Sequence, residues 1–400
     1  MTLSVLGPVE VGPVAHGGHC VARFEGRVIF VRHCLPGEQV MVRITDDSHA
    51  RFWRGDAVEV LEASPDRVAP PCPIAGPGLC GGCDFQHVDL AAQRRLKAAV
   101  VAEQLQRMAS ITWAGEVEDI NTPATAHGLG WRTRMRYHAD PHGRAGLRVH
   151  RGHEIVPLPD IGCPIAAPET PGVVGEIWPE GAELLSAVAS QGRALMVDGS
   201  LKLGSAELVE HAADRDFSVA ADGFWQVHPR AADTLVAAVL AGLEPRRGET
   251  AFDLYCGVGL FAGALLDRGC EVWGVESGHR AVQSARHNLA DGGKRIHLSV
   301  GRVDRRLAAL PKRTDLVVLD PPRAGAGKDV MRAVAGRRPR AIAYVACDPA
   351  ALARDLATAR GLGYEAESIR AFDLFPMTHH VECVAILTPG VRAERGTPER

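Results

Sequence analysis

The stretch Asp253-Leu-Tyr-Cys-Gly257-Val-Gly259 joins an apolar run to a helix-like run and decides the fold of the C-terminal half of the chain. From about residue 217 onward, short apolar runs of strand length alternate with helical stretches. The expected strands are 250–255, 271–276, 296–300, 315–320, 341–346, about 365–370 and 381–387. This alternation is typical of a doubly wound α/β sheet. We therefore predict a complete Rossmann-like domain over residues 217–390.

The glycines of this stretch also predict a cofactor. Gly257 and Gly259, followed by Ala262, fit a dinucleotide fingerprint, which is a weak signal alone. Asp253 argues against NAD, because a carboxylate at the strand end would repel a pyrophosphate. S-adenosylmethionine (SAM) carries no phosphate and presents an ammonium and a sulfonium group to an acid. Glu276, at the end of the next strand, is placed to accept the ribose hydroxyls, so the pattern favours SAM.

Two further candidate groups follow apolar runs of the same domain. Cys347 lies in Tyr344-Val-Ala-Cys347-Asp-Pro349, between an expected strand and a helix start whose free N–H groups would lower the pKa of the thiol. Glu382 is an acid in an apolar run, so burial would raise its pKa toward that of a general base. The alternatives are a small buried residue for Cys347 and a structural ion pair for Glu382.

The N-terminal part of the chain has a different pattern, in which short β-rich runs are not separated by helical stretches. Residues 1–62 contain short β-rich runs separated by Gly and Pro, which predict a small closed barrel. A barrel that serves only as a spacer between domains would fit this pattern.

Cysteine spacing predicts a metal site in the middle of the chain. Cys72-x7-Cys80-x2-Cys83 places three thiols among Gly and Pro. Cys163 is the best fourth ligand, because Cys163-Pro-Ile-Ala166 repeats the phrase Cys72-Pro-Ile-Ala75. Four thiolates accept either zinc or a [4Fe–4S] cluster. A site closed by four cysteines would be structural, within a β-rich central domain over residues 63–216.

That central domain also contains a basic run. In Trp131-Arg-Thr-Arg-Met-Arg-Tyr-His138, basic residues alternate with others, so a strand would place them on one face. Such a face suits RNA phosphates, and a solvated sheet face is the alternative. The whole chain has a net charge of -3, so any nucleic-acid surface must be local.

Composition limits the remaining possibilities. The chain has 400 residues, 46% of them hydrophobic, and its ten cysteines suit a reducing compartment. No leader-like segment and no run long enough for a bilayer is present, so we expect a cytoplasmic monomer with no membrane partner. Residues 391–400 are predicted to be a disordered tail.

Several phrases carry a family resemblance. Gly17-Gly-His-Cys-Val-Ala-Arg23 and the strands after it resemble the TRAM domain, an OB-like RNA-binding barrel. The ordered set of further phrases resembles the RNA 5-methyluridine methyltransferases, including their iron–sulfur members. These phrases are Phe224-Trp-Gln-Val-His-Pro229, Asp253–Gly257, Val275-Glu276, Asp320-Pro-Pro-Arg-Ala-Gly325, Tyr344–Pro349 and Thr378-His-His-Val-Glu382.

The resemblance implies roles for particular residues. It makes Cys347 the nucleophile and Glu382 the base of a class I SAM-dependent methyltransferase domain, and it assigns the SAM and target site to Gln226, Tyr255, Glu276 and Asp320. It also favours a [4Fe–4S] cluster over zinc. Two departures from the family pattern are Leu260, where Asn is frequent, and the seven rather than five residues between Cys72 and Cys80.

The implied activity is methylation of uridine C5 in structured RNA through a covalent bond between Cys347 and C6, with ribosomal RNA favoured over transfer RNA. Two alternatives remain open at this point. One is an iron–sulfur oxidoreductase that uses NAD, and the other is a non-catalytic RNA-binding protein.

Overall fold

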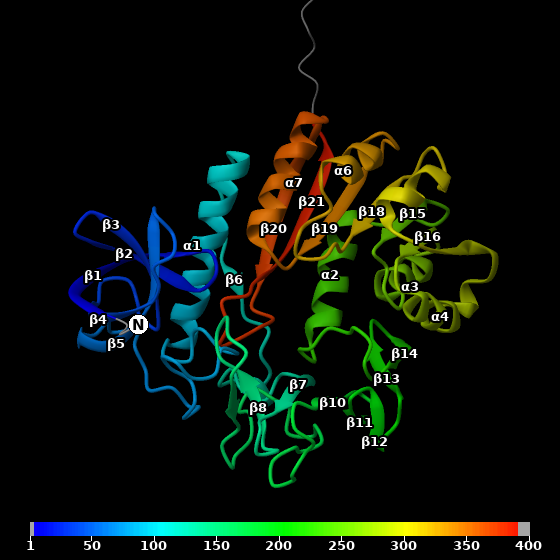
Figure 1. Ribbon diagram of the computed structural model, residues 1–400. Coiled ribbons are helices and arrows are strands. Elements are labelled where there is room, and N and C mark those ends of the chain that lie inside the picture. The colour runs from blue at the N-terminus through cyan, green and yellow to red at the C-terminus, as the bar shows by residue number, and fades with distance from the viewer. Residues whose placement is uncertain (1–3, 391–400) are drawn as a thin grey trace, which may run out of the picture.

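The computed structural model describes residues 4–390 and consists of a barrel, a strand-rich middle part and an α/β domain (Figure 1). The tail expected at 391–400 lies outside the described residues. None of the helices within the described part of the chain combines the length and the apolar character needed to cross a bilayer.

The N-terminal strands close into a barrel in the order β1-β2-β3-β5-β4, which confirms the predicted architecture. Alternate side chains of β3 and β4 point inward, and Ile29, Val31, Val40 and Val42 are fully buried. The strands are β1 (Val5–Ala15), β2 (His19–Phe24), β3 (Arg27–Arg32), β4 (Gln39–Asp46) and β5 (Phe52–Glu62).

Helix α1 (Leu90–Ala109) connects the barrel to the rest of the molecule (Figure 1). Asp89 caps its start by accepting hydrogen bonds from the amides of Ala91 and Ala92. Its residue Val100 packs into the barrel core, whereas Leu105 packs into the core of the α/β domain. The helix therefore contributes side chains to two hydrophobic cores.

The middle part is an antiparallel sheet of six strands in the order β12-β11-β10-β7-β8-β9, followed by the hairpin β13–β14. Its strands are β7 (Arg134–Ala139), β8 (Ala145–Arg148), β9 (Ile155–Pro157), β10 (Glu183–Val188), β11 (Arg193–Val197), β12 (Ser200–Gly204), β13 (Glu207–Ala212) and β14 (Arg215–Ala220). Strand β14 spans the expected domain boundary at 216 and packs against helix α4 (His279–Asn288) of the α/β domain.

The α/β domain is built on a sheet of eight strands in the order β17-β16-β15-β18-β19-β21-β20-β6. Each strand that the sequence predicts in this domain is present. They are β15 (Thr250–Leu254), β16 (Glu271–Glu276), β17 (Ile296–Val300), β18 (Leu316–Leu319), β19 (Ala341–Ala346), β20 (Tyr364–Phe372) and β21 (Glu382–Pro389). The eighth strand, β6 (Val117–Glu118), comes from the middle of the chain and pairs in parallel with β20.

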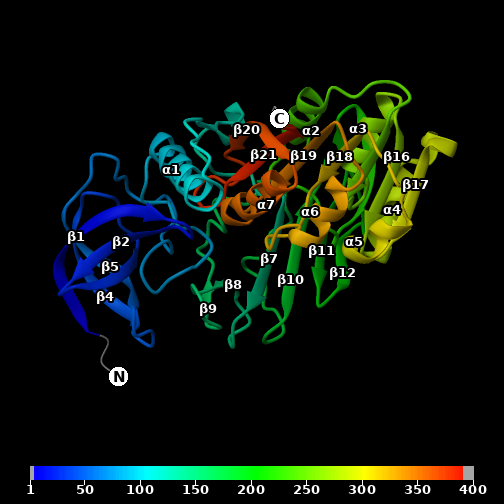
Figure 2. The ribbon, with the colours of Figure 1, turned by 90° about the horizontal axis from the view of Figure 1, so that it is seen from above.

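Helices cover both faces of this sheet (Figure 2). One face packs against α2 (Ala231–Leu243), α3 (Leu260–Asp267) and α4. The other packs against α1, α5 (Val303–Arg306), α6 (Lys328–Ala335) and α7 (Pro349–Gly361). Burial on both faces explains why the central strands read as continuous apolar runs.

Candidate active site

Parallel pairing brings four strand ends together at one edge of the sheet. Strands β16, β15, β18 and β19 are hydrogen-bonded neighbours in that order, and each runs in the same direction. The residues at or just past their ends therefore lie side by side and line a cavity of about 1060 Å³. They are Glu276, Tyr255, Asp320 and Cys347.

Antiparallel strand β21 brings Glu382 to the same edge. Its residue Cys383 pairs with Ala346, so Glu382 lies beside the residue that follows β19, which is Cys347. Gln226, from the segment before α2, and Gly257 also line the cavity. The structure thus assembles in one cavity most of the catalytic and cofactor residues expected from the sequence.

The turn after β15 depends on unusual backbone conformations. Tyr255, Gly257 and Gly259 all have positive φ, at 71°, 54° and 99°. A Cβ atom on Gly259 would lie 2.7 Å from the side chain of Leu289, so only glycine fits there. Gly259 shapes this turn without lining the cavity itself.

Asp253 lies beneath the turn, and it does not line the cavity. Its Oδ2 accepts a hydrogen bond of 2.8 Å from the amide of Ala262, and its Oδ1 has no partner. Burial raises the pKa of Asp253 to about 8, and Asp320 and Glu276 contribute in the same direction. The side chain therefore supports the turn from below, where the sequence suggested direct contact with a cationic cofactor.

Glu276 is held at the rim of the cavity by its own loop. Its Oε1 accepts a hydrogen bond of 2.6 Å from the amide of Gly278, and its Oε2 accepts one of 3.3 Å from the amide of Gly257. These bonds fix the carboxylate beside the glycine turn, where a ribose would lie in a domain of this type.

Two buried acids of the cavity, Asp320 and Glu382, have raised pKa values. Burial raises the pKa of Asp320 to about 7, with Glu276 adding to the effect. Burial also raises the pKa of Glu382 well above its usual range, since the side chain is only 4% exposed; Asp320 adds to this shift and Arg323 opposes it. The raised pKa of Glu382 agrees with the sequence-based expectation.

The expectation for the Cys347 thiol is wrong in direction. Its pKa is raised to about 11, first by burial and then by Glu382, while Arg323 acts in the opposite sense. The start of α7 does not compensate, because its N-cap is Asp348, whose Oδ1 accepts a hydrogen bond of 2.8 Å from the amide of Ala351. The carboxylate, and not the thiol, is bound by the helix N-terminus.

The predicted cysteine set lines a second, smaller cavity. Cys72, Cys80, Cys83 and Cys163 surround a space of about 150 Å³. Burial raises the pKa of each thiol, most strongly that of Cys83. Within residues 4–390, no group of three or more His, Cys, Asp or Glu side chains could hold a metal ion as the structure stands. Gly82 and Arg132 line both this cavity and the large one.

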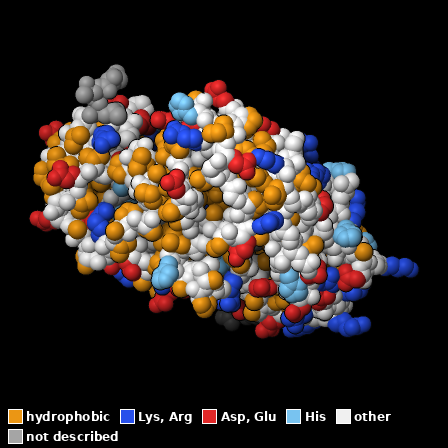
Figure 3. Space-filling view, turned by 90° about the horizontal axis from the view of Figure 1, so that it is seen from below, with side chains coloured by type: hydrophobic (Ala, Val, Ile, Leu, Met, Phe, Trp, Pro, Cys, Tyr) orange, Lys and Arg blue, Asp and Glu red, His pale blue; other side chains and the backbone are white. Residues whose placement is uncertain are grey.

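The arginines expected on one face of β7 are paired with acids and are not free to contact RNA phosphates. Arg134 is buried and donates a 2.6 Å hydrogen bond to Glu210, and Arg136 forms an ion pair with Glu183. These acids belong to distant strands, β13 and β10, so the local sequence could not reveal them. On the face shown in Figure 3, Lys and Arg side chains are mixed with Asp and Glu and form no continuous basic patch.

Sequence reasoning also missed residues that line the large cavity. Phe224 lines the cavity with 75% of its surface exposed. Three cationic side chains, Arg280, Arg302 and Arg323, also line it. Phe224 precedes Trp225-Gln226 in the phrase already recognised, so an exposed aromatic residue could have been suspected there.

Comparisons with known proteins agree with this site. Family models match residues 304–389 (tRNA (Uracil-5-)-methyltransferase), 8–58 (TRAM domain) and 230–337 (Methyltransferase small domain). A protein of Streptomyces avermitilis described as an uncharacterized RNA methyltransferase is 50% identical over 96% of this chain and 98% of its own length. A protein of Bifidobacterium longum with the same description is 38% identical over 95% of this chain and 96% of its own length.

The chain belongs to the RNA (uracil-5-)methyltransferase family. The crystal structure of Pyrococcus abyssi tRNA (uracil-54, C5)-methyltransferase with S-adenosyl-L-homocysteine has the same fold, with a TM-score of 0.71 and 24% identity over 95% of this chain and 99% of that chain. The family models over residues 8–58, 230–337 and 304–389 confirm the TRAM barrel and the SAM-dependent methyltransferase domain. Membership in this family leaves no support for the NAD oxidoreductase or the non-catalytic RNA-binding protein.

Proposed function

We propose that this RNA (uracil-5-)methyltransferase modifies uridine C5 in structured RNA through a transient covalent bond between Cys347 Sγ and C6 of the base. The observation that supports this is that Cys347, directly after β19, lies beside Glu382, the first residue of the neighbouring strand β21, at one wall of a cavity large enough for a cofactor and a base. Asp320 and Gln226 line the same cavity and can bind the polar edge of the uracil or the cofactor.

The chemistry requires both groups. C5 of uracil is too weak a nucleophile to attack a methyl group, so the thiolate of Cys347 first adds to C6 and raises the electron density at C5. Bound SAM supplies the electrophilic methyl group. Glu382, as a carboxylate, then removes the proton from the methylated C5, and the electron pair of that C–H bond re-forms the C5–C6 double bond as the thiolate leaves. The base must be unstacked to reach the cavity, which loops in RNA permit.

The test compares three variants on total RNA from cells that lack the enzyme. Cys347→Ala should give no 5-methyluridine. Glu382→Gln should accumulate a covalent adduct between protein and methylated RNA, visible as a slow band on a denaturing gel, because proton removal is blocked. Cys270→Ala is a matched control, since this buried thiol lies at the start of β16, outside the cavity. Normal turnover by Cys347→Ala would refute the mechanism.

We infer that ribosomal RNA is the substrate in preference to transfer RNA, because the sequence resembles family members that carry both a barrel and a cysteine cluster. Mass-spectrometric mapping of 5-methyluridine in both RNA classes from a deletion strain tests this. Loss of the modification from transfer RNA alone would reverse the assignment.

We also propose a monomer, since one chain supplies every residue of the site, and light scattering of the purified enzyme tests that.

We propose further that Cys72, Cys80, Cys83 and Cys163 hold a structural [4Fe–4S] cluster. The four cysteines line one cavity of about 150 Å³. Thiolate ligands accept both zinc and iron, so the preference for iron rests on the resemblance to the iron–sulfur members of the family. Four thiolates would leave no iron open for catalysis, which is why we propose a structural role.

Anaerobic purification tests the cluster. We expect brown protein whose visible absorption bleaches on oxidation, with about four iron atoms and four sulfides per chain if the cluster is [4Fe–4S]. Cys163→Ser should lower iron content and thermal stability together, whereas Cys270→Ala should retain both. Colourless, fully active protein with one zinc per chain would show that the ion is zinc.

A further inference from the structure

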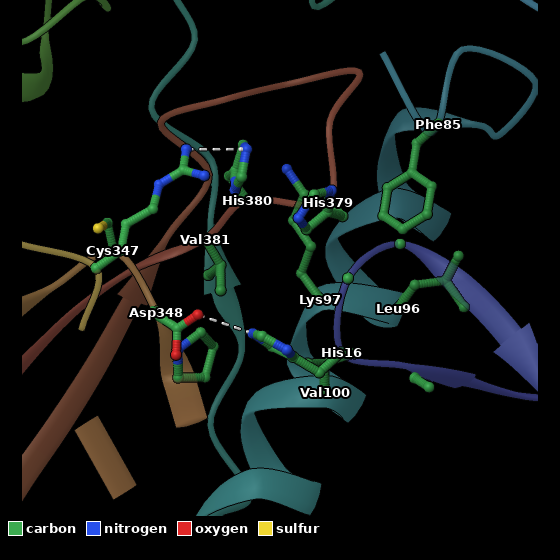
Figure 4. Close-up of a pocket in the computed structure, with 15 residues that line it drawn as sticks. His16, Phe85, Leu96, Lys97, Val100, Cys347, Asp348, His379, His380 and Val381 are labelled. Carbon is green, nitrogen blue, oxygen red and sulfur yellow. Dashed lines mark hydrogen bonds and ion pairs between the residues drawn. The ribbon is translucent and has the colours of Figure 1, made fainter. Parts of the chain in front are cut away.

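A turn of the barrel contacts the catalytic edge directly. The segment between β1 and β2 contains His16, Gly17 and Gly18, and it lines a pocket of about 170 Å³ together with Cys347 and Arg323 (Figure 4). Gly18 has φ +78°, and a Cβ atom on it would lie 2.7 Å from the Cβ of His379. The turn therefore packs closely against the segment that precedes β21.

His16 and Asp348 form the polar contact across this interface. The His16 Nε2 atom lies 3.0 Å from Asp348 Oδ2, and Figure 4 shows the imidazole pointing at the carboxylate. The other oxygen, Oδ1, accepts the hydrogen bond from Ala351 that caps α7. Asp348 follows Cys347 in the chain, so one carboxylate links the barrel, the helix start and the thiol segment.

We propose that His16 is a positioning residue for methyl transfer: its imidazolium holds Asp348 and thereby fixes the orientation and the electrostatic environment of Cys347. The proposal rests on the function proposed above, in which Cys347 is the nucleophile.

The charges around both groups support this role. The hydrogen bond to Asp348 raises the pKa of His16, with Glu103 acting in the same direction and burial and Arg107 of α1 acting against it. Burial raises the pKa of Asp348, but the bonds to His16 and Ala351 outweigh it and the net shift is downward. The ion pair is therefore present at pH values below the raised pKa of His16 and is lost as pH rises through that pKa.

The same pair affects the thiol. Burial, Glu382, Asp320 and Asp348 all raise the pKa of Cys347, while Arg323 lowers it. A protonated His16 offsets the contribution of Asp348. Removing the imidazolium should leave the negative charge of Asp348 uncompensated, which would raise the thiol pKa further and reduce the thiolate fraction.

The experiment measures alkylation of Cys347 by iodoacetamide at pH 7, quantified on the Cys347 peptide by mass spectrometry in the full-length, anaerobically purified enzyme. His16→Ala should slow alkylation by about two- to fivefold, the range for an ion pair near the surface. Asp348→Asn keeps the helix cap and removes the charge, so it should speed alkylation. The double variant should match Asp348→Asn alone, because no charge is left for His16 to offset.

His49→Ala is the matched control, since His49 lies 3.8 Å from Asp46 in the same barrel and does not line the pocket at the interface. It should leave alkylation unchanged. Equal rates for His16→Ala and the unmodified enzyme, or an effect of His16→Ala that persists in the Asp348→Asn background, would overturn the inference.

Steady-state kinetics give a second readout. A positioning role predicts that His16→Ala lowers kcat with little change in KM for RNA, and a change in KM alone would contradict it. The experiments distinguish failure of the proposed function from failure of the proposed role of His16. If Cys347→Ala still methylates RNA, the proposed function falls, but the alkylation result still decides whether His16 acts on the thiol.

Discussion

At the scale of single residues, burial disfavours the charged forms of the acids and of the thiol near the edge of the sheet. Burial raises the pKa of Asp320 to about 7, that of Asp253 to about 8 and that of the Cys347 thiol to about 11. A bound sulfonium would favour the ionised form of each group. We therefore expect the empty site to be unreactive and the cofactor to help create the thiolate and carboxylates that the reaction needs.

The reactivity of Cys347 tests this directly. Because its pKa is raised to about 11, the thiolate fraction should increase about tenfold for each pH unit between pH 7 and 10. Alkylation of the Cys347 peptide in cofactor-free enzyme should follow the same slope. A rate that levels off above pH 8.5 would indicate an ordinary thiol.

Asp253 predicts a pH-dependent cost in stability. Its pKa is about 8 in the folded chain and about 3.9 unfolded, so the folded state binds an extra proton between these values, and stability falls as pH rises through this window. Asp253→Asn should therefore gain stability relative to the unmodified enzyme as pH rises from 5 to 8, by up to about 1.4 kcal/mol per unit. Thermal melts across this range measure the difference. A difference independent of pH would contradict the burial argument.

At the scale of elements, the positions of the strands could be predicted from the sequence better than the pairing between them. Apolar runs such as 341–346 identify the buried strands, because both faces of the sheet are covered. Pairing is not encoded locally, so neither the addition of β6 to the sheet nor the acids opposite Arg134 and Arg136 could be inferred. The burial of Lys97 on α1 could not be inferred from the sequence either.

Lys97 offers a prediction about α1. Its Nζ atom lies 2.5 Å from Asp373 Oδ1, and both side chains are fully buried. Lys97→Met would leave Asp373 without its charged partner and should lower the free energy of unfolding by about 3–5 kcal/mol. Arg95→Met is a matched control on the same helix, because the Arg95–Asp66 pair is largely exposed and should contribute less than about 1 kcal/mol. Equal losses in chemical denaturation would contradict this view.

At the scale of the whole molecule, the three parts depend on one another. The barrel core includes Phe85, Val88 and Val100 from beyond the barrel. Two ion pairs, Arg32–Asp84 and Arg67–Glu38, also cross this boundary. The sequence predicted the barrel, the methyltransferase domain and most of the proposed catalytic and cofactor residues in the large cavity, but not Asp253 and Gly259, which lie outside its lining. Contacts between these parts, including His16–Asp348, could not be read from the sequence, because they depend on how separately folded surfaces meet.

Deletion of residues 1–62 tests this dependence. The shortened chain would expose apolar groups of the shared core, and Arg67 would lose Glu38 while Asp84 would lose Arg32, so its Tm should be at least about 10 °C lower. Calorimetry of the full-length enzyme should show the barrel and α1 unfolding together. A shortened chain that melts at the temperature of the full-length enzyme would mean that the barrel is independent.

The double role of Asp348 has an evolutionary consequence. One oxygen caps α7 and the other contacts His16, and asparagine could perform only the first task without charge. Positions 16 and 348 should therefore covary among homologues: chains with histidine in the barrel turn should keep aspartate after the cysteine, and chains without it should tolerate asparagine. Selection on a barrel residue would then influence which residue is tolerated next to Cys347, 332 positions away in the sequence.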